Sequence, residues 1–166
     1  QAALALARAE RFEEARRRLD LHDAAGSPLA HHLTLRAHLL FEQGDAAGAA
    51  AATARALAFD PGSVDALLLQ GRIARSRGET KHAIDSLRQA IYHRPDCWPA
   101  HYHLAELYRE SGETALARRE YRIVLHQLQD DAAAARTAGS WPLAVAVKDL
   151  RFLCETRLAR LDAAVG

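Results

Sequence analysis

A set of residue types returns every 34 positions along this chain of 166 residues. Glycine recurs at Gly44, Gly78 and Gly112, and proline recurs at Pro61 and Pro95. Small residues keep the same step in two further series, namely Ala37, Gly71 and Ala105, and Ala49, Ala83 and Ala117. A fixed period of roughly 20–50 residues indicates an array of stacked units, none of which can bury its apolar face alone. The sequence therefore predicts a repeat array.

Each recurring residue type has a physical role in a pair of helices. Glycine after the first helix provides the positive φ that a reversal of the chain needs, and proline ends the second helix. The small residues let two antiparallel helices approach closely, so we expect Gly71 and Ala83 to face one another. Larger apolar residues that share the period are expected to fill the seams between helices: Leu40, Leu87, Tyr108 and Tyr121.

This combination of glycine, alanine and proline positions resembles the tetratricopeptide repeat (TPR) from about residue 29 to residue 131. The resemblance implies an all-α fold, a right-handed α-solenoid of antiparallel helix pairs with a C-terminal capping helix. The expected divisions are partial TPR-like helices at 1–29, TPR units at 30–63, 64–97 and 98–131, and a linker with the capping helix at 132–166. Three residues depart from the pattern, namely Thr53, His101 and Gln129. Because Gln129 replaces a proline, the last helix of the array is expected to run on.

The chain after the third unit loses the 34-residue step. Apolar residues recur there at intervals of three and four, which predicts an amphipathic helix: Leu143, Val147, Leu150, Leu153, Cys154, Leu158 and Leu161. The last seam of a repeat array has to be covered, so this helix is expected to cap the solenoid. The alternative is a docking or dimerising helix.

Charge and composition exclude several classes of partner. The formal net charge of +1 supplies no field for nucleic acid, and the apolar stretches are too short for membrane insertion. Two cysteines in an arginine-rich helical chain favour reduced thiols and a cytoplasmic location. The chain has no methionine and begins directly in helix-like sequence, so we expect it to be an excised piece of a larger protein.

Catalytic and cofactor motifs are not expected in this chain. It has no glycine-rich phosphate loop and no nucleophile elbow, so the isolated chain is predicted to be non-catalytic and to need no cofactor. Paired histidines at 31–32 and 101–103 have the wrong spacing for one helical face, and His93, Cys97 and His101 are only distantly compatible with a metal site. No metal is therefore predicted.

The function is expected to lie on the concave face, which the TPR resemblance assigns to the first helix of each unit. Eleven residues are predicted to line this groove: His31, Thr34, His38, Phe41, Asp65, Leu68, Arg72, Arg75, Tyr102, Glu106 and Arg109. The chaperone-type TPR clamp for a peptide carboxylate is not matched, because its places hold Thr34, His38, Leu69, Pro99 and His103.

Arg72 and Arg75 lie one helical turn apart, between the aromatic residues Phe41 and Tyr102. Such a surface suits an extended or helical peptide with acidic and apolar residues. The alternative is that Arg72 is merely paired with Glu106 on the neighbouring helix.

A narrower resemblance rests on residues 2–19 and 90–105, together with Ala117-Arg118-Arg119 and the Leu-Ala-Arg-Leu run at 158–161. These segments are similar to the TPR tail of bacterial chemoreceptor methyltransferases of the CheR type. In that family an upstream domain uses S-adenosylmethionine to methylate receptor glutamates, and the tail serves docking. The resemblance implies a regulatory module whose partner is a chemoreceptor or another domain of the same chain.

Two other functions remain open at this point. The first is a structural or assembly role through homo-oligomerisation or within secretion or pilus machinery. The second is a substrate-receptor domain beside the active site of an enzyme.

Overall fold

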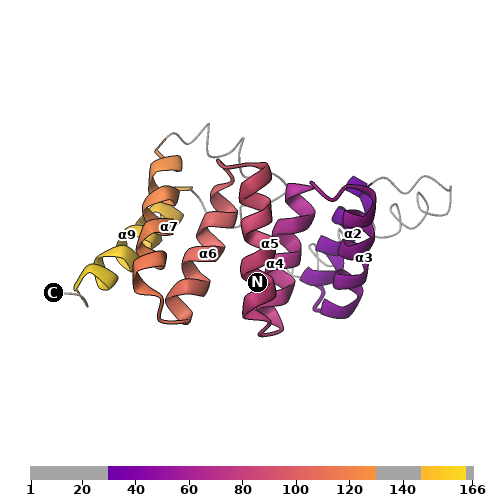
Figure 1. The fold of residues 1–166 in the computed structure, drawn as a ribbon, viewed down its shortest axis with the longest axis horizontal. Helices are drawn as coiled ribbons and strands as arrows, with labels where there is room; N and C mark the ends of the chain where they lie inside the picture. The colour runs from indigo at the N-terminus through magenta and orange to yellow at the C-terminus, as the bar shows by residue number, and fades with distance from the viewer. Residues whose placement is uncertain (1–29, 130–146, 164–166) are drawn as a thin grey trace, which may run out of the picture.

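The computed structural model describes residues 30–129 and 147–163. Within them the chain forms seven helices and no strand: α2 (Ala30–Glu42), α3 (Ala46–Phe59), α4 (Val64–Ser76), α5 (Thr80–His93), α6 (Trp98–Glu110), α7 (Thr114–Gln127) and α9 (Val147–Ala163). Figure 1 shows these helices standing side by side in a row, from α2 and α3 at one end to α7 and α9 at the other. No helix in the described ranges is both long enough and apolar enough to cross a membrane.

Six of the helices form three antiparallel hairpins, α2–α3, α4–α5 and α6–α7, which stack through contacts of α3 with α4 and of α5 with α6. The first helices also contact one another, α2 with α4 and α4 with α6. They therefore form the closely spaced inner layer of the stack, and α3, α5 and α7 form the outer layer. The predicted all-α solenoid of antiparallel helix pairs is confirmed.

The turn inside each hairpin is built in the same way three times. Gly44, Gly78 and Gly112 have φ values of 86°, 75° and 77°, a region that glycine enters at little cost. The amide of Gly44 donates to the Phe41 carbonyl at 3.0 Å, and that of Asp45 to the Leu40 carbonyl at 2.9 Å. This is a Schellman cap, and it recurs at the other two turns. The recurring glycines thus end the first helix of each pair.

The crossing of α4 and α5 is as close as the small residues predicted. A Cβ placed on Gly71 would lie 2.7 Å from Leu87 Cγ and 3.3 Å from the Ala83 carbonyl oxygen. Gly71, Ala83 and Leu87 are all fully or almost fully buried. Gly71 is therefore required by the approach of α5 and not by its own backbone conformation.

His101 departs from the apolar pattern because it makes a buried polar contact between helices. Its Nδ1 lies 2.6 Å from Glu120 Oε2 on α7, and its Nε2 lies 3.1 Å from the Pro95 carbonyl oxygen. The side chains of His101 and Glu120 are both largely buried. The pair connects α6 to α7 and to the loop that precedes α6, so a polar residue is satisfied inside the core.

The last helix, α9, packs on α7 at the end of the array. Leu150 and Cys154 are buried in the main core cluster with Tyr121 and Leu128. Arg118 on α7 also pairs with Asp162 at 2.6 Å. In the described residues α9 thus covers the exposed side of α7, as the capping prediction required.

The expectation that the last helix of the array runs on is wrong. α7 ends at Gln127 and is 14 residues long, the same length as α3 and α5, although no proline follows it. Arg151 of α9 donates to the Leu128 carbonyl, so a side chain satisfies a group at the helix end.

Several predictions concern residues outside the described ranges. These are the partial repeat at 1–29, the linker from residue 132 to residue 146, and Leu143 at the predicted start of the terminal helix.

Candidate protein-binding groove

The predicted groove residues lie at equivalent positions of the repeat on the inner helices α2, α4 and α6. The eleven predicted groove residues come from four places in the 34-residue step, those of His31, Thr34, His38 and Phe41 and their equivalents in α4 and α6. The places of His38 and Phe41 lie in the second half of each helix. There the structure places charged side chains of α2, α4 and α6 in two adjacent groups, which we call the charged network: Arg72 with Glu42, and Arg75 and Arg109 with Glu106 and Glu110.

The Arg72 side chain extends from α4 toward α2. Its Nη2 is 3.2 Å from Glu42 Oε1, and its guanidinium lies over the Phe41 ring at 5.1 Å from the centroid. The expected pairing of Arg72 with Glu106 is therefore wrong. Arg72 turns toward α2 because Glu42 and the Phe41 ring together offer a carboxylate and an aromatic face.

Arg75 makes the contacts to α6 instead. Its Nη2 lies 2.5 Å from Glu110 Oε1 and 3.9 Å from Glu106 Oε2. Arg109 reaches the same two carboxylates, at 2.9 Å from Glu106 and 3.6 Å from Glu110. The groove arginines are thus held in place by carboxylates of the groove itself.

Glu106 is the centre of this network. Its buried carboxylate accepts hydrogen bonds from Tyr121 and Arg109, and Arg157 of α9 lies 3.8 Å away. Burial alone would raise the pKa of Glu106, but the hydrogen bonds from Tyr121 and Arg109 outweigh it and hold the pKa below its usual value. Glu106 is therefore an anion at neutral pH within the inner layer, joined to α4, α7 and α9.

Two histidines of the inner layer are neutral. Burial, reinforced by the charge of Arg72, lowers the pKa of His38 to about 4. Burial, reinforced by Arg72 and Arg75, also lowers the pKa of His103 well below its ordinary value. Both imidazoles therefore contribute no positive charge at neutral pH.

The network contains more arginines than carboxylates. Arg72 pairs with Glu42, whereas three arginines, Arg75, Arg109 and Arg157, contact the two carboxylates of Glu106 and Glu110. The group at Glu106 therefore has one more arginine than carboxylate.

The predicted groove residues do not all reach the surface. Thr34 and Leu68 are each only 2% exposed, and the Thr34 hydroxyl donates to the Ala30 carbonyl. Tyr102, at the equivalent place in α6, is partly exposed, and burial raises the pKa of its hydroxyl. This place in the repeat therefore serves packing in the first two hairpins.

The remaining two predicted residues lie toward the start of their helices. His31 is exposed, and Asp65 is partly exposed with Arg94 at 3.7 Å. Four of the five residues at the places of the chaperone-type clamp are buried, namely Thr34, Leu69, Pro99 and His103, and only His38 is partly exposed.

Sequence reasoning missed Glu42, Glu110 and Arg157. Glu42 and Glu110 stand 68 residues apart, which is twice the repeat, at the last residue of α2 and of α6. Their shared place in the step was a signal that could have found them. Arg157 had no such signal, because α9 follows a different period and only the structure places it beside α6.

No group of three potential metal ligands occurs in residues 30–129 and 147–163. Cys97 and Cys154 are free, buried thiols. Burial, with the nearby charge of Glu106, raises the pKa of the Cys154 thiol to about 12, so the sulfur stays protonated.

Comparison with protein families identifies the repeat. Two models, both described as tetratricopeptide repeat, match residues 34–96 and residues 74–139. Together they span the three hairpins apart from the start of α2. No curated protein sequence matches the chain.

Solved structures share the fold at low sequence identity. The type III secretion chaperone SycD of Yersinia enterocolitica, in complex with a peptide of the translocator YopD, has 16% identity and a TM-score of 0.67, over 82% of this chain and 94% of SycD. MamA has 20% identity and a TM-score of 0.63, over 90% of this chain and 86% of MamA. A chain of a CopN–Scc3 complex has 12% identity and a TM-score of 0.59, over 74% of this chain and 68% of the matched chain.

Proposed function

Because this chain is built from tetratricopeptide repeats, we propose that it is a protein-interaction module whose inner groove binds a peptide with acidic and apolar residues. The observation that carries the proposal is the charged network, in which Arg72 lies over the Phe41 ring while Arg75, Arg109 and Arg157 share only two carboxylates. Arginine suits such a site since its planar guanidinium can bind a carboxylate with two hydrogen bonds.

The two outer carboxylates of the network are the ones a ligand replaces. The Glu42 and Glu110 side chains are 40% and 44% exposed, whereas that of Glu106 is 7% exposed. Exposed ion pairs contribute only about 0–1 kcal/mol, so exchanging one exposed carboxylate for another costs little. Peptide carboxylates therefore take the places of Glu42 and Glu110 on Arg72 and Arg75, while Glu106 keeps Arg75 oriented.

The apolar part of the ligand lies against the aromatic side chains of the groove. Phe41 is partly exposed at one end of the network and Tyr102 is partly exposed on α6. Aromatic residues next to arginine are common among the residues that dominate binding energies at interfaces. A ligand with apolar residues beside its acidic ones gains contacts at both ends.

The test is a selection of random 15-residue peptides displayed on phage, against the parent chain. We expect enriched peptides to carry acidic and apolar residues, and to lose binding to the double variant Arg72→Glu, Arg75→Glu. The matched control is Arg55→Glu, Arg119→Glu, which reverses two exposed arginines of the outer helices α3 and α7. Equal loss in both double variants would contradict a groove site. Arg88 is unsuitable as a control because it donates to the Tyr108 hydroxyl.

An assembly role within secretion machinery is the second candidate. It is favoured by the fold likeness to the type III secretion chaperone SycD, whose structure contains a peptide of the translocator YopD. For this chain such a role means binding a segment of a protein before its export. Identification of the peptides that the chain retains from its own cell, by mass spectrometry of the eluted complex, distinguishes a secreted partner from a signalling partner.

A docking role beside a chemoreceptor methyltransferase rests only on the sequence resemblance of residues 2–19, 90–105, 117–119 and 158–161. Under that proposal the chain changes which receptor glutamates an attached methyltransferase modifies, without binding S-adenosylmethionine itself. Methylation mapping of a parent enzyme with and without this module tests it. An unchanged methylation pattern would remove this context and leave the groove proposal intact.

A further inference from the structure

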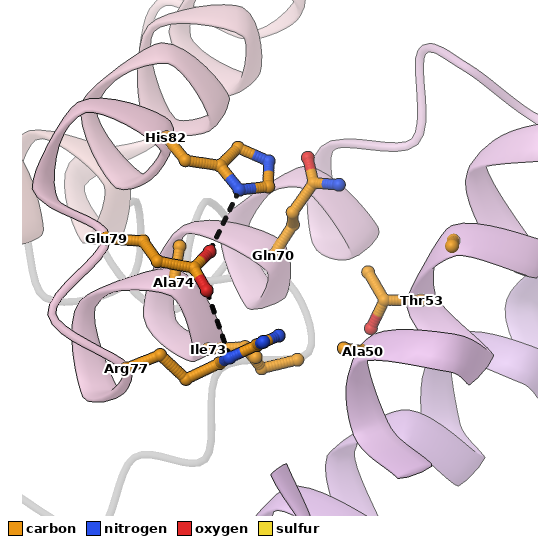
Figure 2. A pocket seen from close by; sticks show the side chains of 9 residues that line it. Ala50, Thr53, Gln70, Ile73, Ala74, Arg77, Glu79 and His82 are labelled. Carbon is orange, nitrogen blue, oxygen red and sulfur yellow. Dashed lines mark hydrogen bonds and ion pairs between the residues drawn. The ribbon is translucent and has the colours of Figure 1, made fainter. Parts of the chain in front are cut away.

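A pocket of about 210 Å³ lies on the outer side of the array, where α3 and the start of α5 diverge over α4. Figure 2 shows it between the Ala50 and Thr53 side of α3 and the polar side chains of α4 and α5. It lies away from the groove network, since none of its lining residues belongs to that network. It therefore offers a second site that the groove function does not use.

The pocket exists because the seam between α3 and α4, the first seam of the array, has small residues at places where the seam between α5 and α6, the second seam, has large ones. Ala54 and Ala74 line the pocket, and their equivalents one repeat later are Arg88 and Tyr108. Thr53, also in the wall, corresponds to the fully buried Leu87. The seam between α5 and α6 is thus filled by the chain itself, and the seam between α3 and α4 is left hollow.

The filled seam shows what kind of group fits this place. Tyr108 is 5% exposed, and Arg88 Nη2 donates to its hydroxyl at 2.9 Å. In the hollow seam both partners of this contact are reduced to alanine. The missing volume is that of a phenol ring and its arginine partner.

The lining of the hollow seam still offers hydrogen-bond donors to a hydroxyl group. Gln70 Oε1 accepts from Ser86 at 2.9 Å, which leaves its amide nitrogen directed toward α3, as Figure 2 shows. Arg77 is held at the edge by Glu79, whose Oε1 lies 3.1 Å from its Nε, so its terminal nitrogens are kept beside the pocket. The floor is apolar, with Ile73 and Ala74 buried.

We propose that this pocket binds the side chain of one tyrosine from a protein partner, with the ring on Ile73 and Ala74 and the hydroxyl accepting from the Gln70 amide. The pocket is smaller than the roughly 300–1,000 Å³ of sites for drug-sized ligands, so it takes a single side chain and not a cofactor. The partner crosses the outer face, and its tyrosine occupies the place that Tyr108 occupies one repeat later.

The probe for this site is N-acetyl-tyrosinamide. Its binding is measured from the NMR chemical shifts of the backbone amides of the full chain. We expect millimolar binding with shifts concentrated at Thr53, Gln70 and Ala74, and at least fivefold weaker binding of N-acetyl-phenylalaninamide, which lacks the hydroxyl. Shifts spread evenly over the surface, or equal affinity for the two probes, would overturn the proposal.

Two variants make the test specific. The double variant Ala54→Arg, Ala74→Tyr copies the second seam, so it should fill the pocket, abolish probe binding and raise the melting temperature. Gln70→Leu copies Leu104 of the second seam and keeps the pocket open, so it should remove the preference for tyrosine over phenylalanine. Persistent probe binding in the filled variant, or an unchanged preference in Gln70→Leu, would contradict the assignment.

A second copy of this chain is the competing occupant, because Tyr92 at the end of α5 is 83% exposed. If that copy fills the pocket, the shifts at Thr53 and Gln70 depend on protein concentration without any probe and disappear in Tyr92→Ala. That result would overturn the proposal that a tyrosine of a different protein occupies the pocket. Concentration-independent spectra, with Tyr92→Ala binding the probe like the parent, support it.

Discussion

At the scale of single residues, the two neutral histidines make the fold sensitive to acid. The pKa of His38 is near 4 in the folded chain, against an ordinary value of 6.5. Between these values the unfolded chain binds a proton at His38 and the folded chain does not. The free energy of unfolding therefore falls as pH drops from about 6.5 to about 4, and this contribution is constant below pH 4.

We expect His38→Gln to lose part of this acid sensitivity. The His38 share is on the order of 1–3 kcal/mol, allowing for partial solvent exposure. Urea unfolding of parent and variant at pH 7 and pH 4.5 measures it, with His126→Gln, an exposed histidine of α7, as the control. His103 acts in the same direction, so some acid sensitivity should persist in the variant. An identical loss of stability in parent and His38→Gln would contradict the assigned burial.

A second residue-scale prediction concerns Gly71. Its added Cβ would press on the Leu87 side chain at 2.7 Å, so Gly71→Ala should already destabilise the fold by about 1–3 kcal/mol, and Gly71→Leu by more. Ala51→Leu, at an exposed place on α3, should change stability by less than about 0.5 kcal/mol. Thermal melts are sufficient for the comparison. A Gly71→Leu variant that melts like the parent would contradict the close crossing of α4 and α5.

At the scale of elements, α9 is needed to close the array. Leu150 is 7% exposed and lies in the main core cluster, while Phe152, two residues later, is 71% exposed. Leu150→Ala should cost about 2–4 kcal/mol, and Phe152→Ala less than about 0.5 kcal/mol. Denaturant unfolding of both variants checks the cap. Similar costs for the two would mean that α9 does not pack on α7 through this face.

The helices of the repeat could be predicted from the sequence, and the reason is physical. Each turn glycine, such as Gly78, has the positive φ that its place in the step required, and Gly71 lies at the predicted close contact. The conformations and contacts of these residues depend only on neighbouring residues or on the other helix of the same hairpin. The 34-residue pattern is therefore sufficient to predict them.

The details of the groove could not be predicted in the same way. Which carboxylate Arg72 meets depends on the rotation of α4 relative to α2 and α6, and the repeat pattern does not specify this rotation. Arg157 enters from α9, which has no place in the period. Even the outer pocket had a sequence signal, the small Thr53 at an aromatic place, but its volume depends on how far α3 and α5 diverge.

At the scale of the whole molecule, the array has two separate faces with different chemistry. The inner layer carries a charged network in which Glu106 orients Arg75 and Arg109. The outer layer carries the pocket left by small residues in the first seam. A partner bound in the groove therefore leaves the outer pocket open to a second contact.

The most direct test of the groove is a charge exchange between protein and peptide. An acidic peptide selected on the parent chain is measured by fluorescence anisotropy, together with a version in which lysine replaces each acidic residue. If peptide carboxylates contact Arg72 and Arg75, the double variant Arg72→Glu, Arg75→Glu should lose at least tenfold in affinity for the acidic peptide and gain affinity for the lysine version. Arg55→Glu, Arg119→Glu should change neither. If the acidic peptide binds the groove variant as tightly as it binds the parent, the inner face is not its site.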